Sequence, residues 1–239
     1  MAQKYAHPPV IEAIVEFRLE NPLSSEQLDA LSEKYADRLP IKETVSTISV
    51  TVDADFAESQ KTNTGYRMRQ EDGGESVTIN DHVLTNSLTG IYSNWDDFME
   101  FVSWSWTNWS GAINENPIAR LGVRFINRID LKNTGQFKIE DYLTIYPMIS
   151  NDPEQILYDY KMQLAIPSNL ENSYVIVNTG MIKPPTGTGS SFILDIDVFR
   201  TEKCPQKHFE IFAYLENIHN EKNELFESFI TDKTREIFQ

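Results

Sequence analysis

The chain has one cysteine, Cys204, among its 239 residues. A single cysteine cannot close a disulfide within the chain, which excludes a disulfide-stabilised scaffold and favours a reducing compartment. Histidine is also scarce, because only His7, His82, His208 and His219 occur and their spacing is not that of metal ligands. The sequence therefore predicts neither a metal site nor a cofactor.

Basic residues and long apolar runs are scarce as well. Lys and Arg number 21 against 36 Asp and Glu, so the formal net charge is −15. A field of this sign repels nucleic-acid phosphate and anionic lipid, which disfavours a nucleic acid as partner. The chain contains no signal peptide and no run of about 18 apolar residues, so we expect a cytoplasmic protein with no membrane association.

Two strand-like segments, residues 10–19 and 119–131, carry the clearest pattern in the chain. Each alternates apolar and polar residues with the two-residue period of a strand, so each has one apolar face. On the other face, residues 10–19 carry carboxylates and residues 119–131 carry guanidinium groups. We therefore expect the two apolar faces to share a core and the opposite charges to pair on the reverse. The charged residues are Glu12, Glu16, Arg120, Arg124 and Arg128.

Each of these strands begins a series in the same order: strand, helix, antiparallel strands, helix. In the first series, Ser24 and Gln27 form a capping-box pattern, and a second helix is expected to start at Ser93. In the second series, Pro205 is expected in the first turn of a long closing helix. We predict an α+β fold of two similar halves, 1–113 and 114–239, in one compact unit. Helices cover the sheets on one side, and the halves arise by internal duplication.

Acidic residues with nearby arginines are the candidates for chemistry. Glu12 and Glu16 share one strand face, Asp195 and Asp197 share another, and Arg124 is a candidate counterion. If these groups lined a cavity, they would suit a phosphate-ester or nucleotide-processing enzyme. If they paired across strands, they would only fix register. We favour the structural interpretation, because ion-pair networks often resemble active sites.

The second expected helix contains all four tryptophans, Trp95, Trp104, Trp106 and Trp109. Three of them follow one helical stripe, whereas Trp104 lies half a turn away with Phe101 beside it. An exposed tryptophan is a typical anchor of a partner surface. Phe101 and Trp104 are therefore the candidate partner-binding residues, with burial of both helix faces as the alternative.

Three segments, residues 5–18, 120–129 and 225–235, carry a resemblance that covers both ends and the middle of the chain. They read YAHPPVIEAIVEFR, RLGVRFINRI and LFESFITDKTR. These segments resemble a sporadically distributed bacterial family of unassigned function. The resemblance implies a bacterial protein whose genes are scattered in the way of mobile or defence-associated genes. It supplies no catalytic residues.

Together these observations predict a non-catalytic intracellular protein that binds a macromolecule, most of all another protein. Its acidic surface suits a defence, toxin-neutralising or mobile-element context, in which such proteins neutralise or scaffold basic partners. The alternative is the phosphate-ester or nucleotide-processing enzyme described above. The sequence leaves homo-oligomerisation open.

Overall fold

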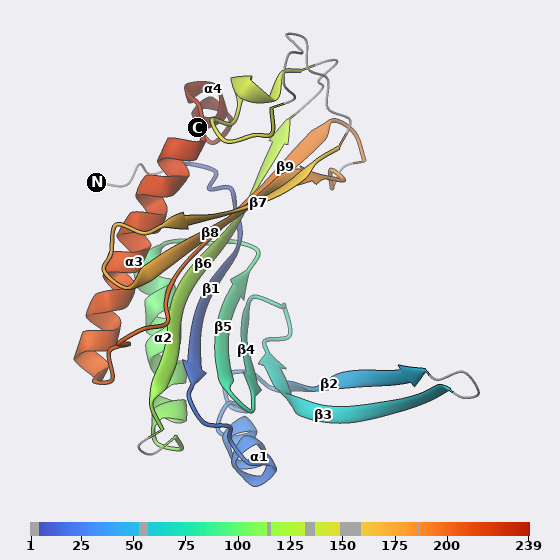
Figure 1. The fold of residues 1–239 in the computed structure, drawn as a ribbon, viewed down its shortest axis with the longest axis vertical. Coiled ribbons are helices and arrows are strands. Elements are labelled where there is room, and N and C mark those ends of the chain that lie inside the picture. Colours follow the sequence, from blue (N-terminus) through green and yellow to red (C-terminus); the bar gives the residue numbers. More distant parts are fainter. Residues whose placement is uncertain (1–4, 53–56, 114–115, 132–136, 149–158, 186) are drawn as a thin grey trace. The chain divides into compact units, whose positions relative to one another are not determined.

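The computed structural model describes residues 5–52, 57–113, 116–131, 137–148, 159–185 and 187–239. The chain has an α+β fold and divides into two compact units. The central unit is Ile14–Arg120, and the terminal unit combines Met1–Ala13 with Leu121–Gln239. Strands β1 (Val10–Leu19) and β6 (Ile118–Leu131) contribute residues to both units. Figure 1 shows the helices and strands coloured along the chain.

The central unit is built on strands in the hydrogen-bonded order β2-β3-β4-β5-β1, with antiparallel pairing from β2 to β5. Helix α1 starts with the predicted capping box, in which Ser24 and Gln27 exchange hydrogen bonds. Helix α2 starts one residue later than predicted, because Asn94 rather than Ser93 accepts from the Asp97 amide. Besides β1 and part of β6, the elements of the central unit are α1 (Ser25–Glu33), β2 (Ile41–Val52), β3 (Ala57–Arg69), β4 (Glu75–Asn80), β5 (Val83–Thr89) and α2 (Trp95–Ser110).

The core of the central unit joins the apolar stripe of β1 to one face of α2. Phe17 is fully buried, and its ring centroid lies 4.8 Å from Trp106 and 6.0 Å from Trp109. Aromatic pairs at these separations add to the gain from burying their area. The predicted apolar stripe of β1 is therefore the core side of this strand.

The terminal unit is an antiparallel sheet in the order β6-β9-β8-β7. The closing helix α3 starts at His208, three residues after Pro205, so the predicted position of this proline in the first turn is wrong. Lys203, two residues before Pro205, has a φ of +50°, and this left-handed conformation is incompatible with an α-helix at that residue. Besides β6, the elements of the terminal unit are η1 (Ile139–Asp141), β7 (Lys161–Pro167), β8 (Ser173–Ile182), β9 (Ser190–Arg200), α3 (His208–Phe229) and α4 (Asp232–Ile237).

Helix α3 covers the face of the terminal sheet that carries the predicted stripe of β6. The Nζ of Lys222 lies 3.6 Å from the centroid of the Phe125 ring, and the His219 ring lies 5.8 Å from it. Ile211, Leu215 and Ile218 of α3 are fully buried. One polar residue, Asn127, interrupts the stripe, and its amide donates to the Leu194 carbonyl at 3.0 Å. The opposite face is called the open face below.

Candidate functional site

The open face of the terminal unit consists of residues that lie opposite one another on four strands. Antiparallel register places them in cross-strand rows, because directly opposed residues point to the same side of a sheet. Four such rows run from β7 through β8 and β9 to β6. They are Pro167, Tyr174, Phe199 and Gly122; Ala165, Ile176, Asp197 and Arg124; Gln163, Asn178, Asp195 and Ile126; and Lys161, Gly180, Ile193 and Arg128.

A chain of hydrogen bonds crosses this face. Arg124 donates from Nε and Nη2 to the two oxygens of Asp195, each at 2.7 Å. Asn178 donates to the same carboxylate at 3.0 Å, and Gln163 donates to Asn178 at 2.8 Å. The bidentate pair is diagonal, because the residue directly opposite Arg124 is Asp197. The network thus ties together all four strands of the terminal sheet.

Arg124 interacts electrostatically with several carboxylates of the terminal unit. Its guanidinium has a raised pKa, chiefly because of the hydrogen bonds to Asp195, with further contributions from the charges of Asp195, Asp197 and Glu12. Burial opposes this rise only in part, since 42% of the Arg124 side chain is exposed against 6% for Asp195. Three carboxylates therefore act on one guanidinium.

The predicted charged residues are distributed between the two units. Glu12, Arg124, Asp195 and Asp197 come together in the terminal unit. In the central unit, Glu16 accepts from Arg120 at 2.7 Å and from Arg18 at 3.3 Å. Each unit thus carries its own ion-paired group.

Asp195 is engaged in a way that suits structure better than catalysis. Both of its oxygens accept hydrogen bonds, three in total, from Arg124 and Asn178. A general base needs an oxygen within reach of a substrate proton, and a phosphate-binding arginine needs its donors available. Here both oxygens of Asp195 are engaged, and Arg124 gives this carboxylate two of its five N–H donors. The arrangement can fix strand register and present a patterned surface.

The predicted aromatic site lies in the central unit. Phe101 is 1% exposed, whereas Trp104 is half-buried. The Trp104 ring stacks on Phe101 at 6.0 Å and meets the edge of Tyr35 at 5.5 Å. The Arg38 guanidinium lies 5.0 Å from the Trp104 centroid and forms two hydrogen bonds with Glu75. Phe101 is therefore buried away from any partner, and a partner that docked here would contact Trp104 and Arg38.

Trp104 is expected to supply most of the fluorescence that a dissolved quencher can reach. The other tryptophans, Trp95, Trp106 and Trp109, are 8%, 6% and 0% exposed. Acrylamide quenching should fall markedly in a Trp104→Phe variant and stay near the wild-type slope in a Trp95→Phe control. Equal slopes in the wild-type protein and the Trp104→Phe variant would show that Trp104 is inaccessible.

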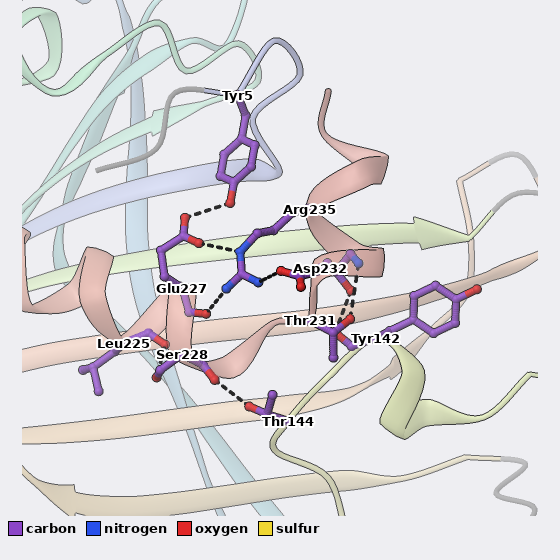
Figure 2. Close-up of polar contacts among 10 residues, drawn as sticks. Tyr5, Tyr142, Thr144, Leu225, Glu227, Ser228, Thr231, Asp232 and Arg235 are labelled. Atoms are coloured by element: carbon purple, nitrogen blue, oxygen red, sulfur yellow. Dashed lines mark hydrogen bonds and ion pairs between the residues drawn. The ribbon is translucent and has the colours of Figure 1, made fainter. Parts of the chain in front are cut away.

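A second polar cluster, which the sequence did not reveal, lies in the terminal unit (Figure 2). Tyr5 donates its hydroxyl proton to Glu227 at 2.8 Å, across 222 positions of sequence. Arg235 donates to the Glu227 carboxylate at 2.9 Å and to Asp232 at 2.7 Å. The Tyr5 ring also meets the edge of Phe238 at 5.3 Å. We call Tyr5, Glu227, Asp232 and Arg235 the terminal cluster.

The end of α3 and helix α4 are fixed by further hydrogen bonds around the terminal cluster. Thr231 caps α4 and donates its hydroxyl proton to the Asp141 carbonyl at 2.6 Å. Thr144 donates to the Ser228 carbonyl at 2.6 Å (Figure 2). The His7 amide donates to the Phe238 carbonyl at 2.9 Å. No local sequence pattern could have found this cluster, because Tyr5 and Glu227 are 222 positions apart.

Replacing Tyr5 with phenylalanine is expected to lower the free energy of unfolding by about 1 kcal/mol. Burial and the hydrogen bond to Glu227 raise the pKa of Tyr5, so its hydroxyl stays protonated and acts as a donor. The matched control is Tyr174→Phe, because Tyr174 is 45% exposed and its hydroxyl lies 3.5 Å from Glu202. Urea unfolding of both variants checks the difference. An equal effect of the two substitutions would contradict the role of Tyr5.

The third cluster is a buried lysine and histidine on α3. Lys222 is 4% exposed, and its Nζ donates to Asn223 Oδ1 at 2.6 Å. The Asn223 amide nitrogen therefore donates to His219 Nε2 at 3.0 Å, which assigns the histidine proton to Nδ1. Burial lowers the pKa of Lys222 to about 7 and that of His219 to about 3. His219 is therefore neutral at physiological pH.

Within the described ranges, no three His, Cys, Asp or Glu side chains are grouped so that they could hold a metal ion. No helix in the same part of the chain is long and apolar enough to cross a membrane. No protein-family profile matches the sequence, and comparison with curated proteins finds no match.

Proposed function

We propose that this chain is a non-catalytic cytoplasmic protein of bacteria that binds another protein. The observation that carries the proposal is the pairing of Arg124 with Asp195 through two hydrogen bonds of 2.7 Å. These side chains are the ones that an enzyme of the alternative class would need for substrate. Since Asp195 holds Arg124 by two hydrogen bonds, they form a structured surface, and recognition by such a surface is the function that fits them.

The acidic charge supports a basic partner. With a net charge of −15, the chain attracts cationic proteins and repels nucleic acid. Such a charge suits neutralisation of a basic toxin or scaffolding of a defence component. Membership of the sporadically distributed bacterial family, which the three segments indicate, is part of the same proposal.

We also propose that the two halves are related by duplication. The order β1, α1, β2 to β5, α2 is followed by β6, η1, β7 to β9, α3, so both series run strand, helical segment, antiparallel strands, helix. The compact units, however, divide within β1, after Ala13, and within β6, after Arg120, and not at residue 113 alone. Fusion of two duplicated halves into one chain would account for strands, here β1 and β6, that contribute residues to both units.

The alternative function is a phosphate-ester or nucleotide-processing enzyme that uses Glu12, Glu16, Arg124, Asp195 and Asp197. The exposed part of Arg124 favours it, because a guanidinium can bind phosphate bidentately. Asp195 takes the Nε proton and one Nη2 proton of Arg124, so such a substrate would have to bind the remaining Nη1 and Nη2 protons.

Affinity capture from nuclease-treated lysate of the native host tests the proposal. We expect one host protein to be retained in a fixed ratio to the chain and to be released by high salt, because the attraction is partly electrostatic. Absence of any protein at a fixed ratio would count against the function. Turnover of a nucleoside triphosphate that an Arg124→Met variant lacks would establish the enzymatic alternative instead.

A further inference from the structure

Strand β7 is the outermost strand of the terminal sheet, and among the described residues no further strand pairs with its outer edge. The Met181 amide donates to the Tyr160 carbonyl at 3.1 Å, so these residues form a hydrogen-bonded pair one step before Lys161 and Gly180. Hydrogen-bonded and non-hydrogen-bonded pairs alternate along an antiparallel ladder. The odd-numbered residues of β7 therefore direct their backbone groups outward, and only the last of them lacks an amide proton. They are Lys161, Gln163, Ala165 and Pro167.

The apolar side of β7 is less well covered than the same side of its neighbour β8. Val175 and Val177 on β8 are fully buried, whereas the residues opposite them on β7, Ile166 and Leu164, are half-buried. Met162 on the same side of β7 is half-buried as well. The core stripe of the terminal sheet thus reaches its outer edge with apolar side chains that another strand would cover.

The sequence of β7 lacks the features that usually keep an edge strand from pairing. Those features are charged side chains, proline and bulges within the strand. In β7 the one charged residue, Lys161, comes first and Pro167 comes last, and the pairing with β8 is regular between them. The composition and geometry of β7 thus favour the addition of a strand.

We propose that the added strand is β7 of a second copy of this chain, so that two chains form a homodimer with a continuous sheet. An antiparallel pair centred on Leu164 places Leu164 opposite its own copy and Met162 opposite Ile166. Each half-buried apolar side chain of one strand then lies opposite an apolar side chain of the other. Lys161 comes opposite Pro167, so no like charges are opposed. This self-complementarity identifies a second copy as the occupant and does not depend on the proposed function.

An Ala165→Pro variant tests the backbone pairing. The Ala165 amide points outward, so proline there leaves the β7–β8 ladder intact and removes only the donor to the Gln163 carbonyl of the second copy. We expect the dissociation constant of the dimer to rise at least about tenfold, because each copy loses one hydrogen bond. Ala165→Val is the matched control, since it keeps the amide and should dimerise like the wild-type protein. Sedimentation equilibrium measures all three proteins.

Cysteine cross-linking tests the register and does not depend on the proline variant. In the proposed pair Leu164 meets its own copy at a non-hydrogen-bonded position, where the Cα atoms are about 4.5 Å apart and a disulfide fits. Lys161 lies about 20 Å from its own copy, because each is opposite Pro167 at the far end of the other strand. Leu164→Cys should therefore form a covalent dimer on mild oxidation, and Lys161→Cys should not. The wild-type protein is the background control, because its Cys204 is buried.

Salt distinguishes the homodimer from the proposed capture of a basic host protein. Because each copy carries a net charge of −15, added salt should tighten the dimer by screening repulsion, whereas it should release a basic partner.

A wild-type protein that stays monomeric throughout the micromolar range would overturn the inference. A dimer that Ala165→Pro leaves unchanged, or equal cross-linking of the two cysteine variants, would do the same, because the interface would then lie elsewhere. If a monomeric wild-type chain captures a host protein that Ala165→Pro loses, the edge binds a strand of that partner. The second copy would then be wrong and the proposed function would stand.

Discussion

A Lys222→Met variant is expected to be more stable than the wild-type protein at pH 6, by up to about 4 kcal/mol in the free energy of unfolding. Burial lowers the pKa of Lys222 from 10.5 to about 7. At pH 6 the folded protein must therefore hold a buried ammonium group that the unfolded chain exposes to water. Methionine has a similar length and no charge, so it removes this cost.

The stability difference between the variant and the wild-type protein should depend on pH in one direction. Between pH 7 and pH 10.5 the unfolded chain binds more protons at Lys222 than the folded chain, so this lysine makes wild-type stability rise with pH. Below pH 7 both states are protonated and the cost is constant. The advantage of Lys222→Met should therefore be full at pH 6 and shrink toward pH 10.

Urea unfolding of both proteins from pH 6 to pH 10 measures this difference, and other titrating groups cancel in the subtraction. Lys207→Met is the control, because the Lys207 side chain is 82% exposed and its removal should change stability little at any pH. A difference between Lys222→Met and wild type that is constant over the whole range would show that Lys222 is solvated in the folded protein.

An Arg124→Met variant is expected to lose about 2 kcal/mol of stability. The Asp195 side chain is 6% exposed, and without Arg124 its carboxylate retains, among the described residues, only the hydrogen bond from Asn178. The loss lies below the usual range for a buried ion pair because Arg124 is 42% exposed and solvent screens the interaction. Asp195→Asn should cost less, since Arg124 can then turn toward water.

The surface ion pair of Arg18 and Glu16 provides the control for this prediction. Arg18 is 50% exposed and lies 3.3 Å from Glu16, so Arg18→Met should change stability by less than about 1 kcal/mol. Thermal or urea unfolding of the three variants ranks them. If Asp195→Asn cost more than Arg124→Met, the burial of the carboxylate would not be the cause.

The apolar faces of β1 and β6 could be predicted because their two-residue period is a local property of the sequence. Ala13, Val15 and Phe17 are all fully buried, and so are Leu121 and Val123. The capping box of α1 was predictable for the same reason, since Ser24 and Gln27 are three residues apart. Features of this kind depend only on neighbours in sequence.

The partners of the charged residues could not be predicted, because they depend on register and side-chain reach. Arg124 lies directly opposite Asp197 and yet binds Asp195 two residues along the strand. The terminal cluster depends on contacts between Tyr5 and Glu227, which are 222 positions apart. Burial of Lys222 escaped prediction as well, since a lysine in an amphipathic helix is normally solvated.

The most direct test of the ion-paired sheet surface is calorimetric titration of the wild-type protein with the magnesium complexes of ATP and of inorganic triphosphate. Because Asp195 takes two of the Arg124 donors and compensates its charge, we predict no saturable heat of binding and no release of phosphate. Binding of one triphosphate per chain that Arg124→Met abolishes would contradict the account and identify these residues as a substrate site.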